Sequence, residues 1–380
     1  MIRKILIIIK RMLIGIGVLL GVVLITTTIF IYSSPEFGGK ASKEEKELYS
    51  NSNNYKEGKF INRGNVEMSM DFNKFVKSLV GYFKPSPKTR PSEDITVEKI
   101  DSLSIVNYND STRLVWFGHS TFLLQMNGKN ILIDPMFGDV PAPNPILGSN
   151  RFSRELPIQI EKLPIIDAVI LSHDHYDHLD YGSILKLKDK VGHFYTPLGV
   201  GVHLQEWGVS PERITELDWW QESNFDDLIF RCTPAQHFSG RGINDRGNTL
   251  WASWIIQSTT ENIFFSGDSG YGSHFKEIGN KYGPFDFAMM ECGQYNEMWK
   301  EIHMMPEETA QAAIDIKANR IMPIHWGAFK LAMHSWTDPV ERILKKANEL
   351  NVSVIVPRIG ESISLEQQDY TTTDWWDKFN

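Results

Sequence analysis

Four residues of types that bind metals lie within six positions of the chain: His173, His175, Asp177 and His178. They follow the apolar run Asp167-Ala-Val-Ile-Leu, which is short and rich in branched residues and therefore predicts a buried strand. Loops at strand ends present functional groups to a site. Imidazole nitrogens and carboxylate oxygens together suit zinc or a related first-row metal, so the cluster predicts a metal centre.

Three further candidate ligands come after other apolar runs. Asp268 follows Asn262-Ile-Phe-Phe, His325 follows Arg320-Ile-Met-Pro-Ile, and His237 comes five residues after a run at 228–232. Small residues beside these side chains allow sharp turns and close approach of the backbone to a metal. Each residue alone is typical of a hydrogen-bonded structural position. Together with the first cluster, they complete a set of seven candidate ligands.

Asp134 ends the run Asn130-Ile-Leu-Ile. It could accept the N–H of a ligand imidazole, or it could form a simple turn after the strand, and the sequence leaves both readings open. Trp251 and Trp254 lie in a strand-like run, where core packing is expected and the lining of an acyl-chain groove is the alternative. No neighbouring pattern marks four other histidines as functional: His193, His203, His274 and His334.

The composition is that of a globular protein with a sizeable core, with 42% hydrophobic and 23% charged residues among 380. The formal net charge is −8, and because phosphate binding requires a basic face, nucleic acid is not expected as a partner. Cys232 and Cys292 cannot supply a disulfide framework. We expect both thiols to be buried and apolar in character, with pairing as the alternative.

The N-terminal segment predicts a membrane anchor. Residues 12–32 carry no charge, and a bilayer core is spanned by roughly 20 apolar residues. Arg3, Lys4, Lys10 and Arg11 precede this run, so the N-terminus is expected in the cytoplasm and the catalytic part outside it, in a single-pass protein of the cell membrane. A cleaved export signal is the alternative, although such signals have apolar cores of about 7–15 residues and no A-x-A-like site follows.

We expect three parts along the chain. Residues 1–33 form a cytoplasmic stub and anchor, and the turn-rich residues 34–110 form a tether and an N-terminal elaboration, with an amphipathic helix at Met68–Phe83. Residues 111–380 form the compact domain.

In that domain, strand patterns alternate with helix signals, which predicts an α/β or α+β layered architecture. Asn127-Gly128 predicts a hairpin. Helices are predicted to begin at Pro306 and at Asp338, with Asp338 as the capping residue. The predicted strands are residues 114–117, 121–126, 130–133, 165–171, 228–232, 251–257, 262–265, 285–290, 321–324 and 352–356.

The order of these motifs resembles that of the metallo-β-lactamase superfamily. Within it, the sequence looks like the N-acyl-phosphatidylethanolamine-hydrolysing phospholipase D group and its bacterial membrane-anchored relatives. The resemblance covers about residues 100–365 and is carried by Trp116-Phe-Gly-His-Ser, Ile131-Leu-Ile-Asp-Pro, Gly267-Asp-Ser-Gly-Tyr, Gly283-Pro-Phe-Asp, His303-Met-Met-Pro-Glu-Glu and Ile324-His-Trp-Gly.

This resemblance implies a four-layer αββα sandwich with two zinc ions between the sheets at one edge. One zinc ion would bind His173, His175 and His237, the other would bind Asp177, His178 and His325, and Asp268 would bridge both. His303 would lie near the metals and could protonate a leaving group or bind a phosphate oxygen. His119 is expected to be structural. Because the resembling phospholipases are dimers, a homodimer is a further expectation.

Two metal ions would lower the pKa of a shared water, and the resulting bridging hydroxide, oriented by Asp177, could attack phosphorus or a carbonyl carbon. The leading hypothesis is a membrane-anchored phosphodiesterase of phospholipase D type that acts on N-acyl-phosphatidylethanolamine-like phospholipids. In the second hypothesis, the same metals hydrolyse a lactone, an amide or a small phosphodiester, because superfamily members differ in their pocket walls. The third is a non-catalytic, metal-stabilised envelope protein, which the intact ligand set disfavours. A β-lactamase in the strict sense is also disfavoured, because that group typically lacks the bridging carboxylate.

Overall fold

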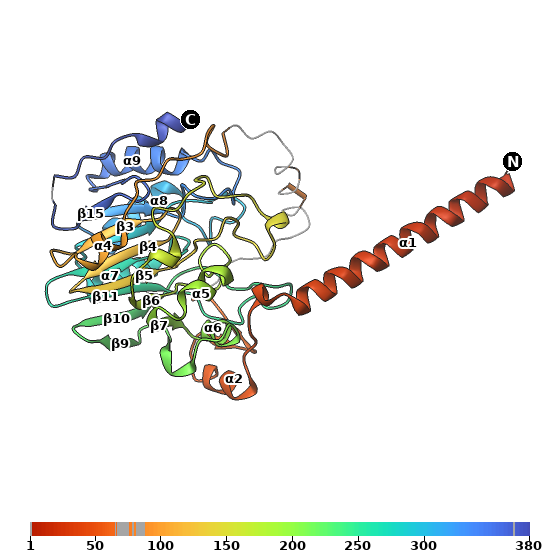
Figure 1. Cartoon of the computed structure of the whole chain (residues 1–380), viewed down its shortest axis with the longest axis horizontal. Helices are drawn as coiled ribbons and strands as arrows, with labels where there is room; N and C mark the ends of the chain where they lie inside the picture. The colour runs from red at the N-terminus through yellow and green to blue at the C-terminus, as the bar shows by residue number, and fades with distance from the viewer. Residues whose placement is uncertain (1, 65, 67–75, 78–79, 81–87, 368) are drawn as a thin grey trace. The chain divides into compact units, whose positions relative to one another are not determined.

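The computed structural model describes residues 2–64, 66, 76–77, 80, 88–367 and 369–380 (Figure 1). The chain divides into two compact units, Met1–Phe37 and Gly38–Asn380. Apart from residues 76–77 and 80, the helix predicted at Met68–Phe83 lies outside the described residues.

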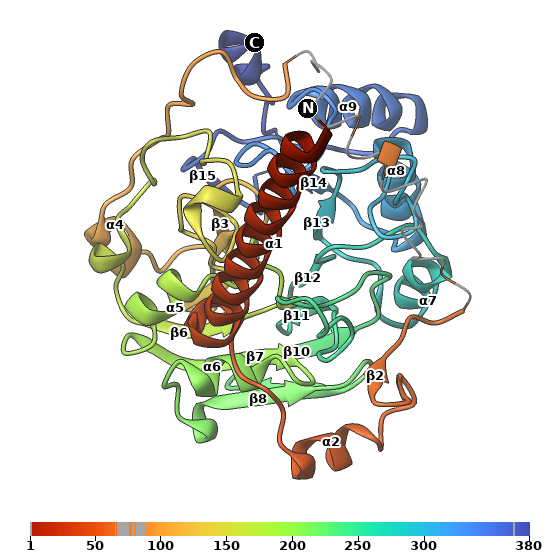
Figure 2. The same ribbon diagram turned by 90° about the vertical axis from the view of Figure 1, so that its right-hand side faces the viewer.

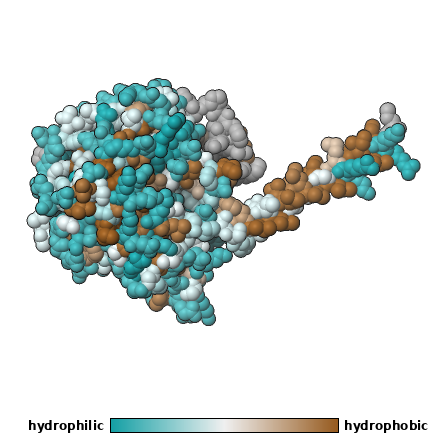
Figure 3. Space-filling model, in the orientation of Figure 1, coloured by the Kyte–Doolittle hydropathy of each residue, from teal (hydrophilic) through white to brown (hydrophobic). Residues whose placement is uncertain are grey.

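The first unit is dominated by one helix, α1 (Ile2–Ser33). At roughly 1.5 Å per residue, this helix is about 48 Å long, which exceeds a bilayer core of about 30 Å. Its apolar side chains are exposed along most of its length, and its charged residues gather toward the N-terminus (Figure 3). The helix is therefore long and apolar enough to cross a membrane.

The larger sheet of the second unit has seven strands in the order β15-β3-β4-β5-β6-β7-β8. Strands β5 to β8 pair in parallel, and the pairs β15-β3, β3-β4 and β4-β5 are antiparallel. Asn127 and Gly128 both have positive φ in the β4–β5 turn, as a tight hairpin requires. The strands are β3 (Arg113–Trp116), β4 (Phe122–Met126), β5 (Lys129–Ile133), β6 (Ile166–Ile170), β7 (Val191–Pro197), β8 (Ile214–Leu217) and β15 (Ser362–Ser364).

The second sheet has six strands in the order β14-β13-β12-β11-β10-β9. Its first three strands in this order pair in parallel, and the remaining pairs are antiparallel. The strands are β9 (Glu222–Phe225), β10 (Leu228–Thr233), β11 (Ser253–Gln257), β12 (Asn262–Phe265), β13 (Phe287–Glu291) and β14 (Ile321–Ile324).

The two sheets face each other between outer layers of helices, so the expected αββα sandwich is confirmed (Figure 2). Phe122 of the first sheet and Phe265 of the second meet in the central core, with ring centroids 6.5 Å apart. The outer face of the larger sheet packs against α5 (Tyr181–Leu187) and α6 (Gly201–Glu206). The outer face of the second sheet packs against α7 (Ser273–Tyr282), α8 (Pro306–Asp315) and α9 (Asp338–Leu350).

Segments that precede the first sandwich strand in the chain, and segments that follow the last one, also pack into the central core. Before β3 lie α2 (Lys43–Tyr49), the hairpin of β1 (Tyr55–Lys56) and β2 (Lys59–Phe60), and α4 (Ser102–Val106). Phe60 and Ile95 are buried in the central cluster. From the C-terminal side, Trp375 stacks on Trp326 with ring centroids 5.8 Å apart. Residues 38–64 and 88–110 are therefore packed parts of the second unit.

Nine of the ten predicted strands form, with ends that differ by at most two residues. The strand predicted at 352–356 is wrong: only Val354 makes a bridge, to Ile321. Pro323 explains this outcome, because the N–H that would continue this parallel ladder on β14 is missing there. Strands β1, β2, β7, β8, β9 and β15 were not predicted.

Two smaller predictions have clear outcomes. The helices α8 and α9 begin at Pro306 and Asp338 as expected, but the residue before α9 is Thr337 and Asp338 is not the cap. The Asp338 carboxylate instead accepts hydrogen bonds from Tyr295 and Arg342. Both cysteines are unpaired and buried, as expected.

Candidate metal centre and its pocket

The seven candidate ligands follow strands of both sheets. His237, Asp268 and His325 come after β10, β12 and β14, which run in the same direction within the second sheet. The loop 173–178 comes after β6 of the larger sheet, and the N–H of Ala252 donates to the carbonyl of Ser172 where the two sheets approach. Because the carboxyl ends of these strands meet at one edge, all seven side chains are brought together there.

The first group consists of three histidines. Nδ1 of His175 lies 2.9 Å from Nε2 of His173 and 3.1 Å from Nε2 of His237. Burial lowers the pKa of all three imidazoles, well below the usual value for His173 and His237. The three rings are therefore neutral and direct nitrogen atoms at one point, which is the donor set of a zinc site.

The second group consists of Asp177, His178 and His325, accompanied by His119; one ligand atom from each lies within 4.8 Å of the others. Oδ2 of Asp177 is 3.5 Å from Nε2 of His178 and 3.9 Å from Nε2 of His325. Within the described residues, neither of these Nε2 atoms makes a hydrogen bond, although both are buried.

Asp268 stands between the two groups. Its Oδ1 lies 3.2 Å from Nε2 of His178 and 2.9 Å from Nδ1 of His325. Its Oδ2 lies 3.8 Å from Nε2 of His173 and 3.7 Å from Nε2 of His237. One carboxylate therefore turns one oxygen toward each group, which is the geometry of a residue that could bridge two metal ions.

The outward-facing nitrogens of three of these candidate ligand histidines are held by other groups. Nδ1 of His178 is 2.7 Å from Oδ2 of Asp134, so of the two roles left open for Asp134 the structure shows the contact with the imidazole of a candidate ligand. Nδ1 of His173 is 2.9 Å from Oγ of Ser172. Nδ1 of His237 donates to the carbonyl of Ile302 over 3.0 Å. Such partners fix the ring orientation and tautomer of a metal-binding histidine.

His119 acts on the centre through Asp177. Its Nε2 is 2.8 Å from Oδ2 of Asp177, and burial lowers the pKa of His119 to about 3. The backbones of His119 and His325 are also joined: the His325 N–H donates to the His119 carbonyl, and the His119 N–H donates to the Trp326 carbonyl. This supporting position agrees with the structural role expected for His119.

The charges of the centre fit bound cations. Burial opposes ionisation of Asp177 and Asp268, but the neighbouring imidazoles outweigh it and hold the pKa of both carboxyls well below the usual range. The same carboxylates, together with Asp134, outweigh burial at His178 and raise its pKa well above the usual value. Two buried carboxylates therefore lie among histidines whose buried Nε2 atoms, at His178 and His325, make no hydrogen bond within the described chain. Since buried charges are normally paired or coordinate metals, this donor set suits zinc ions.

Three residues at the centre have a backbone conformation that side chains rarely adopt. The φ angles are +56° at His119, +41° at Asp134 and +67° at His325. Such conformations cost about 1–3 kcal/mol each and collect at functional sites, where the surrounding structure enforces them. Here, they direct three side chains into the space between the sheets.

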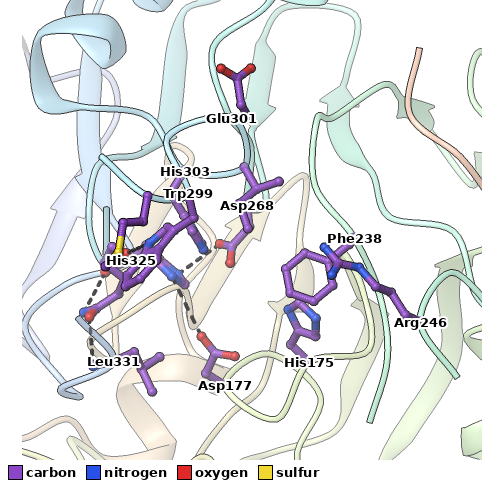
Figure 4. Close-up of a pocket in the computed structure, with 13 residues that line it drawn as sticks. His175, Asp177, Phe238, Arg246, Asp268, Trp299, Glu301, His303, His325 and Leu331 are labelled. Carbon is purple, nitrogen blue, oxygen red and sulfur yellow. Dashed lines mark hydrogen bonds and ion pairs between the residues drawn. The ribbon is translucent and has the colours of Figure 1, made fainter. Parts of the chain in front are cut away.

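A cavity of about 300 Å³ opens at the centre (Figure 4). His175, Phe238 and Arg246 form one side, and the Arg246 guanidinium lies 4.2 Å from the centroid of the Phe238 ring. Trp299 and Leu331 lie on the opposite side. Sequence reasoning predicted His175 but missed the other four residues, because they lie in irregular loops without a motif. The remaining lining includes Asp177, Asp268, Gln294, Met298, Glu301, Ile302, His303 and His325.

His303 lines this cavity, and one of its ring nitrogens lies within 4.8 Å of ligand atoms of Asp268 and His325. Its Nδ1 is 3.3 Å from Oε1 of Glu291, a fully buried residue at the end of β13 that sequence reasoning missed. Burial lowers the pKa of His303 to about 3 and, aided by the charge of Asp268, raises that of Glu291 well above its usual value. Both shifts favour the neutral form of the side chain.

The predicted tryptophans serve the core. Trp251 and Trp254 are both buried, and the indole N–H of Trp254 donates to the carbonyl of Leu171, across the two sheets. Neither lines the cavity at the metal centre, where Trp299 is the tryptophan present among the described residues.

Comparison with known proteins places this geometry among hydrolases. A family profile described as a β-lactamase superfamily domain matches residues 129–326. An uncharacterized protein of Mycobacterium tuberculosis is 38% identical over 343 residues, covering 88% of this chain and 90% of the relative. N-acyl-phosphatidylethanolamine-hydrolyzing phospholipase D 1 of Caenorhabditis elegans is 31% identical over 290 residues, 72% of this chain and 80% of the relative. The isothiocyanate hydrolase from Delia radicum gut bacteria has a similar fold, with a TM-score of 0.53 and 22% identity, over 66% of this chain and 98% of that one.

Proposed function

Because the chain belongs to the metallo-β-lactamase superfamily, we propose that it is a membrane-anchored two-zinc hydrolase that cleaves N-acyl-phosphatidylethanolamine-like phospholipids in the manner of phospholipase D. The observation that carries this proposal is the position of the His and Asp cluster beside a cavity with an apolar side. The proposed substrate class is taken from the name of the Caenorhabditis elegans relative, an N-acyl-phosphatidylethanolamine-hydrolyzing phospholipase D.

One zinc ion would bind His173, His175 and His237. The other would bind Asp177, His178 and His325. Asp268 would bind both ions, because its two oxygens face the two groups at 2.9–3.8 Å. When bound, the ions would supply a nucleophile from water at neutral pH and stabilise negative charge on the phosphate.

The protein's own residues would orient the reacting groups. Asp177, held at 2.8 Å by His119, would accept a hydrogen bond from the attacking water. A neutral Glu291 can donate its proton to Nδ1 of His303, which leaves the ring hydrogen on Nε2. His303 would then donate from Nε2 to an oxygen of the phosphate or of the leaving group.

The cavity walls suit an amphiphilic anion. Trp299, Met298 and Leu331 offer apolar surface to an acyl chain, and the exposed Arg246 offers a positive charge on the other side. Ligand sites usually combine such apolar surface with a few polar groups that fix orientation. A phospholipid with an acylated headgroup carries both features, whereas a small phosphodiester would leave the apolar side unused.

The helix α1 would hold the enzyme at its substrate. Its positively charged residues precede the apolar run, so the N-terminus would lie in the cytoplasm and the hydrolase outside it. A single-pass anchor of this kind keeps the cavity near lipid, which raises the chance of encounter without any added affinity in the pocket.

The test is product analysis by mass spectrometry. Full-length, zinc-loaded protein is incubated with N-acyl-phosphatidylethanolamine in mixed micelles, with the Asp268→Ala variant as the control. Water would add a hydroxyl to phosphorus and a proton to the departing oxygen, so the expected products are phosphatidic acid and N-acylethanolamine. The variant should yield neither.

Other outcomes would overturn specific parts of the proposal. Cleavage of a chromogenic phosphodiester without any lipid product would keep the phosphodiesterase chemistry and discard the lipid. Hydrolysis of a lactone or an amide, with both phosphodiesters untouched, would replace the reaction class. A protein that binds no zinc would refute the two-metal centre itself.

A further inference from the structure

The side chain of Asn62, in the N-terminal part of the second unit, hydrogen-bonds to both backbone groups of the candidate ligand His237; this pair of hydrogen bonds is called the bracket. Oδ1 of Asn62 accepts a hydrogen bond from the N–H of His237 over 3.1 Å, and Nδ2 of Asn62 donates to the His237 carbonyl over 2.7 Å. The indole N–H of Trp251 also donates to Oδ1 of Asn62, over 3.2 Å. The carboxamide thus pairs with both backbone groups of His237, a residue 175 positions later in the chain.

The segment around Asn62, residues 54–63, is called the arm here. It is fixed to the sandwich by several contacts. Nζ of Lys59 donates to Oδ1 of Asn248 over 2.6 Å, and the N–H of Phe60 donates to the carbonyl of Gly247 over 2.7 Å. Gly247 has φ +71°, and a Cβ there would lie 2.9 Å from the carbonyl oxygen of Phe60. The arm therefore approaches the loop that follows His237 too closely for a larger residue.

Among the described residues, the two hydrogen bonds from Asn62 are the ones that hold the backbone N–H and carbonyl of His237. It follows the end of β10, outside the strand ladder, and is fully buried. Its ring is held separately, because Nδ1 donates to the carbonyl of Ile302. Asn62 thus sets where the residue sits, and Ile302 sets how its ring is turned.

From this geometry we propose that Asn62 is a positioning residue of the metal centre, so that the arm must be docked for one of the two metal ions to bind with full affinity. The inference rests on the proposed assignment of His237 to a metal ion. Buried backbone groups that lose their partners must move toward other partners or water. Metal sites tolerate little displacement of their ligands. A shift of His237 would therefore weaken metal binding at the site that includes this residue.

The test uses Co²⁺ alone as the probe. Metal-free full-length protein is titrated with Co²⁺ in detergent. The visible absorption of the bound Co²⁺ then measures metal binding at the sites, and this measurement does not depend on enzymatic activity. Asn62→Ala removes the bracket. Asn54→Ala is the matched control, because Asn54 belongs to the same arm and its Nδ2 donates to Asp218, over 3.1 Å, instead of to a candidate ligand. Near-UV circular dichroism verifies that both variants are folded.

The expected result is that wild type and Asn54→Ala bind two ions with the same affinities, whereas Asn62→Ala binds one of its ions roughly 10–100-fold more weakly. The absorption band of that site should also change. If Asn62→Ala binds both ions as wild type does, the inference is overturned while the proposed function stands. If the wild type binds no metal, both fail together.

A second variant keeps the test decisive if Asn62→Ala does not fold. Asn62→Asp retains the acceptor for the His237 N–H but cannot donate to the His237 carbonyl while ionised. We expect a smaller loss of affinity, again confined to one of the two ions. Wild-type affinities at both sites in this variant would overturn the proposal as well.

Discussion

Asp134 and His178 face each other across 2.7 Å, from carboxylate Oδ2 to ring Nδ1, and the other oxygen of Asp134 accepts the N–H of Ser172. The carboxylate therefore joins the loop 173–178 to the end of β5. It also leaves Nε2 of His178 free of hydrogen bonds among the described residues and 3.2 Å from Asp268.

Replacing Asp134 by Ala should weaken zinc binding about 10–100-fold, because the His178 ring loses the partner that fixes its tautomer and orientation. Competition with a chromophoric chelator would measure this change. Asp134→Asn, which can still accept a hydrogen bond, should lose less. Equal zinc affinity in all three proteins would show that Asp134 supports only the backbone of Ser172.

Replacing Asp268 by Ala should lower the number of bound metal ions and abolish turnover, since both groups lose a shared ligand. Elemental analysis after gel filtration would give the stoichiometry, and the lipid assay would give the rate. Full activity with two bound ions would contradict the bridging role.

Replacing His303 by Ala should retain both metal ions and slow hydrolysis by roughly 10²–10⁴-fold, the usual contribution of a residue that transfers or shares a proton. Glu291→Gln is an informative companion, because a neutral amide resembles the neutral acid in shape and can donate to Nδ1 of His303. We expect it to lose far less activity. An unchanged rate in His303→Ala would make this residue purely structural.

Replacing Trp299 by Ala should impair long-chain substrates selectively. The loss of apolar contact is worth about 1–2 kcal/mol, which corresponds to roughly a 5- to 30-fold lower kcat/KM. Hydrolysis of a small chromogenic phosphodiester should change little. Trp220, which lies outside the cavity lining, provides the control through Trp220→Ala. Equal losses on both substrates would argue against an acyl-chain wall.

His274 should make stability depend on pH. Burial lowers its pKa to about 3 in the folded protein, so the unfolded chain binds one more proton between about pH 3 and pH 6.5. This contribution to stability is present above pH 6.5 and is lost as pH falls, by at most about 1.4 kcal/mol per pH unit. Urea unfolding from pH 7.5 to 4.5 should therefore show a shallower decline for His274→Gln than for wild type. Parallel curves would exclude this origin.

The cluster of candidate metal ligands could be predicted because most of its residues are recognisable from their immediate neighbours in the chain. The H-x-H-x-D-H motif and single residues after apolar runs are visible in the linear chain, and so is Asp134 at the end of its strand. The backbone strain at His119 and His325 has no such signal, since it arises from how the two residues pair across the fold.

Residues that act over long separations could not be predicted. Asn62 lies in a polar stretch that reads as a tether, and only the packed chain brings it to His237. Glu291 ends a strand that was predicted, but its contact with His303 depends on the loop between them. The strand expected at 352–356 failed in part for a similar reason, because one of the two prolines that interrupt the ladder, Pro323, belongs to the neighbouring strand, whereas the other, Pro357, follows the segment itself.

The stack of Trp375 on Trp326, the residue after His325, has a consequence for biogenesis. A ribosome releases Asn62 long before His237, and it releases residues 375–379 about fifty positions after His325. A partly synthesised chain therefore lacks the rings that back one ligand even when the motif at 173–178 is already made. In the proposed enzyme, the complete metal centre would therefore form only after these C-terminal residues have been synthesised.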